Sequence, residues 1–148
     1  MASCLLDVNV LIALSWSHHI HHHAAHRWFA SHRRRGWATC PLTEAGFLRV
    51  SMQPAAIGRV VLFSEALHAL RLNVETPGHE FWACDFSLAQ LDPEVQQLVR
   101  GARQVTDAIL LDLAIRRRGR LATLDQRISD LLPPGVSERG AIDLIPVD

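Results

Sequence analysis

The chain has 148 residues, and its 15 basic residues, all arginine, balance 15 acidic ones to give a formal net charge of zero. This length suits a single domain over residues 1–148 that can bury a full core without disulfides or metals. Hydrophobic residues make up 49% of the chain and charged residues 20%, which excludes the disordered and fibrous classes. The net charge gives no indication of a nucleic-acid partner.

Neither a membrane span nor a disulfide framework is expected. No apolar stretch approaches the roughly 20 residues that cross a bilayer. The apolar run after residue 3 has no basic lead and soon reaches Asp7, so it predicts a buried strand rather than a signal peptide. Cys4, Cys40 and Cys84 are odd in number and form no C-x-x-C pair, which favours reduced, mostly buried thiols. We therefore expect a cytoplasmic protein.

Short apolar strands alternate with longer helices along the chain, with no repeat, linker or domain boundary. Strands are predicted at residues 4–6, 37–39, 121–124 and 142–147. Helices are predicted at residues 10–14, 20–35, from Pro41 onward, 55–72, 93–99 and 106–118, while residues 73–92 give no clear pattern. This order predicts an α/β fold, a three-layer α/β/α sandwich around a mostly parallel sheet.

Four acidic residues fall where a predicted strand ends or a helix begins. Asp7 and Asp125 end two strands, whereas Glu44 and Asp107 lie in the first turns of helices. Ligands of such sheets bind outside the carboxyl ends of the strands, and carboxylates gathered there form the oxygen-rich site that Mg²⁺ or Mn²⁺ requires. One pocket is therefore expected to collect all four side chains.

The neighbours of these acids add detail, although each acid taken alone also has an ordinary structural interpretation. Asn9 can add a neutral oxygen ligand beside Asp7, but the Asp-x-Asn pattern also forms simple turns. Thr106 is predicted to cap the helix that carries Asp107. Asp112 points away from Asp107 on that helix and is expected to pair with Arg116 instead.

The segments around the four acids resemble the acidic motifs of PIN-domain ribonucleases, most closely those of the VapC toxins. These segments are residues 5–11, 43–44, 105–108 and 122–127. The resemblance runs from the first strand to the last. It implies a Mg²⁺-dependent endoribonuclease, usually a homodimer, that a VapB-type antitoxin holds inactive by blocking the acidic pocket.

The same resemblance assigns roles by motif match. Asp7 and Asp107 become the chief metal ligands, Glu44 and Asp125 complete the acidic centre, and Asn9 and Thr123 support it. The chemistry suits the residues, because a metal-activated water can attack phosphorus without a serine or cysteine nucleophile. Mn²⁺ is a possible substitute for Mg²⁺.

Three other interpretations remain open. His22 and His26, in a histidine-rich stretch outside the family pattern, have the i, i+4 spacing that can hold zinc. A phosphatase is disfavoured, because such sites normally use a lysine and this chain has none. A catalytically silent module could instead bind RNA or a protein through its arginine clusters, at residues 33–35 and 116–120. Because a glycine follows each cluster, both also suit solvated helix ends.

Overall fold

The structure is a computed structural model that describes residues 2–138 and 140–147. Its centre is a five-stranded sheet in the order β3-β2-β1-β4-β5, and every pairing is parallel. The strands are β1 (Cys4–Leu6), β2 (Trp37–Thr39), β3 (His79–Phe81), β4 (Arg120–Thr123) and β5 (Ile142–Leu144). The expected parallel α/β fold is confirmed, and β3 comes from the segment that gave no clear pattern.

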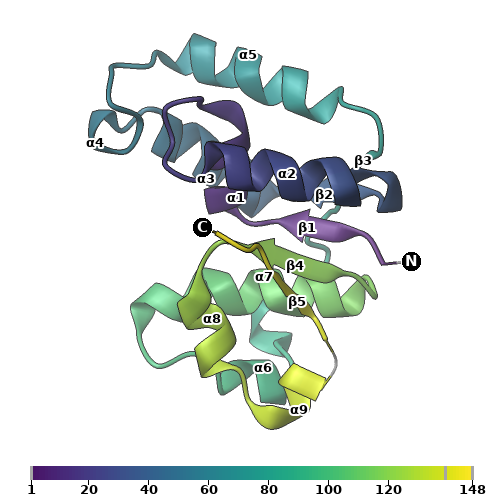
Figure 1. Cartoon of the computed structure of the whole chain (residues 1–148). Coiled ribbons are helices and arrows are strands. Elements are labelled where there is room, and N and C mark those ends of the chain that lie inside the picture. Colours follow the sequence, from purple (N-terminus) through teal and green to yellow (C-terminus); the bar gives the residue numbers. More distant parts are fainter. Residues whose placement is uncertain (1, 139, 148) are drawn as a thin grey trace.

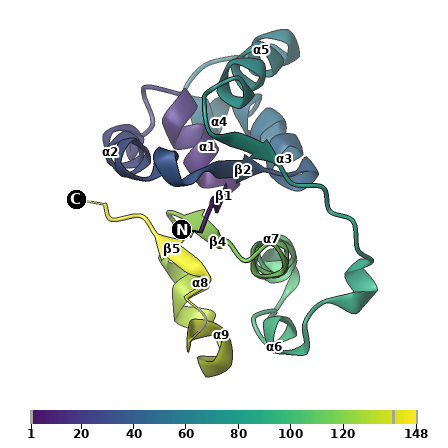
Figure 2. The same cartoon turned by 90° about the vertical axis from the view of Figure 1, so that its right-hand side faces the viewer.

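Helices cover both faces of the sheet and make the predicted three layers. One face carries α1 (Val8–Ser15), α2 (His22–His32), α3 (Pro41–Ser51), α4 (Pro54–Ile57) and α5 (Phe63–Val74) (Figure 1). The other carries α6 (Pro93–Gln96), α7 (Val105–Arg116), α8 (Gln126–Leu131) and α9 (Pro134–Glu138) (Figure 2). Short 3₁₀ turns lie at Arg33–Arg35, Leu88–Gln90 and Ala102–Gln104.

Each face of the sheet has its own core. Cys4 and Leu6 of β1 pack with α1, α2, α3 and α5, whereas Leu5 points to the opposite side and packs with α6 and α7. This alternation follows from the two-residue period of a strand. The central strand β1 is thus buried on both faces, and its carboxyl end is fixed between the two helical layers.

The single helix predicted over residues 55–72 is wrong, because the structure divides it into α4 and α5. Gly58 adopts a left-handed conformation with φ of 85° directly after α4, which ends that helix. The intervening chain leaves Val60 71% exposed while Val61 is buried. Val60 therefore does not belong to an apolar helix face.

Other element boundaries also differ from the sequence-based expectation. The helix predicted at residues 93–99 ends at Gln96, and the last strand ends at Leu144. The helix predicted at 106–118 runs from Val105 to Arg116, with Gln104 at its N-cap position, so Thr106 is not the cap. Arg118, not Gly119, takes the left-handed conformation after that helix, with φ of 55°.

The expectations for the cysteines and for Asp112 are confirmed. Cys4 and Cys40 are buried and Cys84 is partly buried, and all three are free thiols. Asp112 accepts a hydrogen bond from Arg116 Nε at 2.7 Å. Within residues 2–138 and 140–147, no helix combines the length and apolar character that a bilayer span needs.

Candidate active site

Asp7 stands at the carboxyl end of β1 and begins α1. Its Oδ1 accepts a hydrogen bond from the backbone N–H of Val8 at 2.7 Å, so it serves as the N-cap of α1. Its Oδ2 accepts a hydrogen bond from the hydroxyl of Thr123 at 2.8 Å. Asn9 Nδ2 approaches the same Oδ2 at 3.4 Å. The carboxylate is therefore fixed by the neighbouring strand β4 as well as by its own helix.

Asn9 and Thr123 both lie where a supporting role requires them. Asn9 Nδ2 donates to Thr123 Oγ1 at 3.2 Å, and Asn9 Oδ1 accepts from the backbone N–H of Leu124 at 3.1 Å. The amide oxygen of Asn9 is thus already used, which argues against its service as a neutral metal ligand. Asn9 instead joins α1 to the end of β4 and orients Asp7.

Asp107 lies in the first turn of α7, on the opposite helical layer. Burial, and after it the negative charges of Asp7 and Asp125, raise its pKa to about 6. Burial likewise raises the pKa of Asp7, and the charge of Asp125 adds to the effect, although hydrogen bonds from Thr123 and Val8 oppose it. These shifts indicate that the three carboxyl groups interact through space.

Asp125 follows β4 and is the N-cap of α8. Its Oδ1 accepts a hydrogen bond from the backbone N–H of Arg127 at 2.9 Å and lies 3.2 Å from Arg127 Nε. The backbone N–H of Asp125 in turn donates to Thr123 Oγ1 at 3.1 Å. Asp125 is therefore partly neutralised by the hydrogen bonds of Arg127, and the charge of Arg127 also opposes the raised pKa of Asp107 through space.

A cavity of about 430 Å³ gathers three of the four predicted acids. Asp7, Asp107 and Asp125 line it together with Asn9. Its lining does not include Glu44. Glu44 Oε2 instead accepts a hydrogen bond from Thr39 Oγ1 at 2.6 Å, and the same hydroxyl lies 2.7 Å from His79 Nε2. Glu44 thus lies at the end of β2, in a separate hydrogen-bonded group.

The donor set of this cavity suits a hard divalent cation. Mg²⁺ takes oxygen ligands, keeps several waters and needs only one or two carboxylates from the protein. Asp7 and Asp107 each have a raised pKa partly because another carboxylate is near, and a bound cation relieves that repulsion. Within the described ranges, no three histidine, cysteine or acidic side chains form a ready-made metal cage. The residues therefore fit a largely hydrated ion.

The histidine-rich stretch caps α1 rather than forming a catalytic centre. His22 Nδ1 lies 2.7 Å from the carbonyl oxygen of Ala13, and His26 Nε2 lies 2.8 Å from that of Leu14. Because a carbonyl only accepts, each of these ring nitrogens carries the hydrogen. Both carbonyls belong to the last turn of α1, where they have no partner within the helix. The i, i+4 spacing that suggested zinc thus has a structural explanation.

A comparison with protein families decides what this fold and site belong to. The family model described as the PIN domain matches residues 4–131 of the chain. The chain belongs to the PIN-domain family. The match runs from β1 through α8 and thus includes Asp7, Glu44, Asp107 and Asp125.

Curated relatives place this PIN domain among the VapC ribonucleases. The chain is 48% identical over 127 residues to ribonuclease VapC38 of Mycobacterium tuberculosis, covering 86% of this chain and 88% of that protein. It is 40% identical over 136 residues to ribonuclease VapC39 of the same species, covering 92% and 98%. The chain is therefore a PIN-domain ribonuclease of the VapC family, as the resemblance of its acidic motifs implied.

A solved structure shares the fold of this PIN domain. It is the crystal structure of VapBC2 from Rickettsia felis bound to a DNA fragment from their promoter, and it matches with a TM-score of 0.61. The match covers 96% of this chain and 98% of that chain at 15% sequence identity. At this identity the likeness concerns the fold alone.

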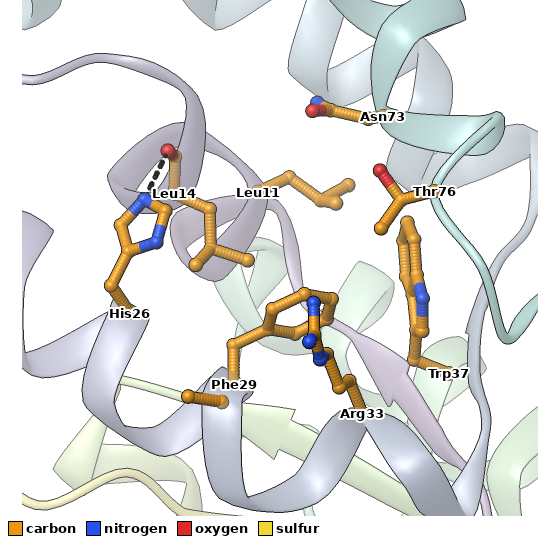
Figure 3. Close-up of a pocket in the computed structure, with 9 residues that line it drawn as sticks. Leu11, Leu14, His26, Phe29, Arg33, Trp37, Asn73 and Thr76 are labelled. Atoms are coloured by element: carbon orange, nitrogen blue, oxygen red, sulfur yellow. Dashed lines mark hydrogen bonds between the residues drawn. The ribbon is translucent and has the colours of Figure 1, made fainter.

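A second cavity of this PIN domain, about 300 Å³, lies between α1, α2 and α5 (Figure 3). Leu14, Phe29 and Trp37 face it, and His26 and Arg33 lie at its edge. None of the predicted acids is among the residues that line it. This cavity is therefore separate from the acidic one.

Sequence reasoning missed one side chain of the acidic cavity. His19, from the loop between α1 and α2, lines it with Asp7 and Asp107. In the sequence His19 is one member of a run of histidines with no distinguishing spacing. Only the path of the loop in the folded chain brings His19, and not the neighbouring His18, to the cavity.

Proposed function

We propose that this chain is a Mg²⁺-dependent endoribonuclease that hydrolyses RNA phosphodiester bonds at the acidic cavity, with Mn²⁺ as a possible substitute. Dependence on a divalent metal is general for VapC ribonucleases. That Mg²⁺ is the ion used by this chain is part of the proposal. The observation that carries the proposal is the meeting of Asp7, Asp107 and Asp125 in one cavity. These residues come from three separate parts of the chain and from both helical layers.

The proposed roles follow from how each side chain is held. Asp7 and Asp107 hold the ion, because they face the cavity without an arginine partner of the kind that Asp125 has. Thr123 and Asn9 orient Asp7 through their hydrogen bonds to it. Asp125 completes the negative field of the site. When bound, the divalent ion supplies an activated water and screens the charge that builds on the phosphoryl oxygens.

Glu44 keeps a proposed place in the acidic centre, with a different geometry from the other acids. It occupies the first turn of α3 beside the carboxyl end of β2, which neighbours β1 in the sheet. Its hydrogen bond to Thr39 holds it at this edge. We expect Glu44→Gln to reduce RNA cleavage less than the loss of Asp7 or Asp107 does.

Cleavage of a long single-stranded RNA transcript by the purified chain tests the function. We expect cleavage with Mg²⁺ or Mn²⁺, none in EDTA, and loss of cleavage in Asp7→Asn with the fold intact by circular dichroism. Asp85→Asn is the matched control, because Asp85 is exposed and does not line the cavity. A chain that cleaves no RNA with either metal, or cleaves equally well as Asp7→Asn, contradicts the proposal. RNA binding that survives neutralisation of all four acids without any cleavage favours the silent binding module.

We further propose that the chain acts in the cytoplasm, as a homodimer whose partner is a VapB-type antitoxin. Its curated relatives are VapC ribonucleases, and the solved structure with the same fold is a VapBC complex. Met52, Val60, Leu62 and Phe63 leave large apolar side chains exposed over a short stretch, which suits a protein interface. Light scattering tests the dimer, and a short neighbouring reading frame for a DNA-binding protein tests the antitoxin.

A further inference from the structure

The loop that carries His19 is held firmly against the helices around it. The backbone N–H of His19 donates to the carbonyl of Trp16, and its own carbonyl accepts from the N–H of His22, both at 3.0 Å. Trp16 Nε1 donates to the hydroxyl of the buried Ser51 at 3.0 Å, which ties the loop to α3. His19 is partly buried, whereas the flanking His18 and Ile20 are exposed. The ring therefore has a defined place at the cavity.

A backbone hydrogen bond fixes which nitrogen of His19 carries the hydrogen. Nδ1 accepts from the backbone N–H of His21 at 3.0 Å, so Nδ1 is unprotonated and the hydrogen resides on Nε2. Burial lowers the pKa of His19, and the neighbouring His21 and His22 lower it further. The ring is thus a neutral imidazole whose one N–H is at Nε2.

The cavity otherwise offers very few hydrogen-bond donors to an RNA phosphate. Its acidic members only accept, and Ile12, Val50 and Ala56 have apolar side chains. Asn9 Nδ2 already donates to Asp7 and Thr123. Among the described residues that line the cavity, His19 alone has a side-chain N–H with no hydrogen bond to another described residue.

We propose that His19 contacts the substrate, its neutral Nε2–H donating a hydrogen bond to a non-bridging oxygen of an RNA phosphate held in the acidic cavity. This inference rests on the proposed ribonuclease function of the same cavity. A phosphate is the expected acceptor because the carboxylates bring a cation, and hence a phosphodiester, to this place. A neutral donor adds no positive charge that could bind to the carboxylates in place of the metal. The acids thus attract the ion, and His19 orients the anion.

The test uses three variants of the full chain and labelled single-stranded RNAs, one of mixed sequence and one for each of the four bases. His19→Ala removes the donor, whereas His19→Gln keeps an amide N–H near the position of Nε2. His18→Ala is the matched control, because His18 is exposed in the same loop and does not line the cavity. Cleavage is measured with Mg²⁺, and RNA binding is measured by anisotropy with Ca²⁺ in place of Mg²⁺, since Ca²⁺ also takes oxygen ligands, over a range of monovalent salt concentrations. Thermal denaturation checks that each variant folds.

We expect His19→Ala to lose about 10- to 100-fold in kcat/KM, the effect of one hydrogen bond to a charged acceptor. His19→Gln should recover most of this loss, and His18→Ala should match the wild type. The slope of log affinity against log salt should stay unchanged in His19→Ala, because a neutral donor releases no counterion. The Mg²⁺ concentration for half-maximal activity should not move.

Four results overturn the inference. The first two are cleavage and RNA binding at the wild-type level in His19→Ala, and equal losses of kcat/KM in His19→Ala and His19→Gln. The third is a salt slope lowered by about 1 in His19→Ala, as for a cationic contact. The fourth is a loss of cleavage confined to RNAs with one particular base. The binding measurement separates this failure from that of the ribonuclease proposal. If the wild type cleaves no RNA, the ribonuclease proposal fails, while the effect of His19→Ala on RNA affinity with Ca²⁺ still decides whether His19 contacts RNA.

Discussion

The two ends of α1 carry two polar groups of residues in this PIN domain, and they are organised in opposite ways. At its N-terminus Asp7 faces Asp107 and Asp125, and burial among these like charges raises the pKa of Asp7 and Asp107. At its C-terminus His22 and His26 donate to backbone carbonyls that have no partner within the helix. Both ends suit the helix dipole, which favours anions at the N-terminus. Only the acidic end retains repulsion that a ligand can relieve.

This contrast predicts that neutralising one of these acids lowers RNA cleavage and raises the stability of the metal-free fold. Asp107→Asn should lower RNA cleavage by about 100-fold or more, because loss of a direct ligand should exceed the 10- to 100-fold typical of supporting residues. In the absence of metal the same variant should be more stable than the wild type, since one repelling charge is gone. Cleavage assays and denaturation in EDTA measure the two effects.

Asp112 on the same helix supplies the matched control. It is buried and pairs with Arg116, and it also accepts a hydrogen bond from the backbone N–H of Asp92 at 2.7 Å. Asp112→Asn should therefore destabilise the fold by about 1–3 kcal/mol, the cost of leaving hydrogen-bond partners unsatisfied. If both variants were equally destabilising, the carboxylate of Asp107 would be a structural group and not a candidate ligand.

Removal of the Thr123 hydroxyl is the next change expected to weaken the acidic cavity at the N-terminus of α1. It donates to Asp7 and accepts from Asn9 and from the backbone of Asp125, and the residue is fully buried. Thr123→Val keeps the shape but leaves these groups unpaired, so we expect a loss of about 1–3 kcal/mol in the free energy of unfolding. Cleavage should fall about 10-fold because Asp7 loses its orientation.

Thr123→Ser separates the hydroxyl from the methyl group. Serine keeps the three hydrogen bonds and loses only apolar contact in the core, at a cost of about 1 kcal/mol. Its cleavage rate should stay close to that of the wild type. A serine variant as inactive as the valine variant would show that packing, not the hydrogen bonds to Asp7, sets the activity.

The pH dependence of stability gives a smaller, independent measure of the burial and the repulsion that raise the pKa of Asp107. The pKa of Asp107 rises from 3.8 to about 6 on folding, so between these values the folded chain binds more protons than the unfolded chain. This contribution stabilises the metal-free fold as pH falls from about 7 to about 4. Its size is about 1.5 kcal/mol once the partial exposure of Asp107 is discounted for solvent screening.

Comparison with Asp107→Asn isolates this effect from that of the histidines. Burial lowers the pKa of His19 and His79, which acts in the opposite direction and removes stability as pH falls below about 6.5. The difference in unfolding free energy between wild type and Asp107→Asn, measured in EDTA, should shrink from pH 7 to pH 4. Mg²⁺ should stabilise the wild type more at pH 7.5 than at pH 5. A difference that does not change with pH would mean that neither burial nor the neighbouring charges raise the pKa of Asp107.

The sequence predicted the acidic end better than the histidine end, for a physical reason. Asp7 and Asp125 follow apolar strands, and parallel strands bring their carboxyl ends to one edge, so the meeting of distant acids follows from the pattern alone. The place of Glu44 outside the cavity lining depends on its hydrogen bond with Thr39, which no pattern encodes. The break at Gly58 was likewise hidden, because apolar residues on both sides continue a helical spacing.

The histidine run illustrates what the pattern leaves undetermined. The spacing of His22 and His26 fits a metal pair and a pair of helix caps equally well, since both need two rings on one face. The outcome depends on where α2 lies against α1, which is a matter of tertiary packing. The same packing brings His19 to the acidic cavity and leaves His18 and His23 exposed.

The last and smallest prediction concerns the cap at the C-terminus of α1. His22→Ala leaves the carbonyl of Ala13 without its donor, and because His22 is only partly buried we expect a loss of about 0.5–1 kcal/mol in unfolding free energy. His23→Ala, at an exposed neighbouring position, should change stability by less than about 0.5 kcal/mol. Urea denaturation of both variants measures the difference, and excess zinc should not alter it. Zinc-dependent stabilisation that is lost only in His22→Ala would show that His22 and His26 bind the metal. A helix cap that uses a carbonyl as its acceptor gains no stability from zinc.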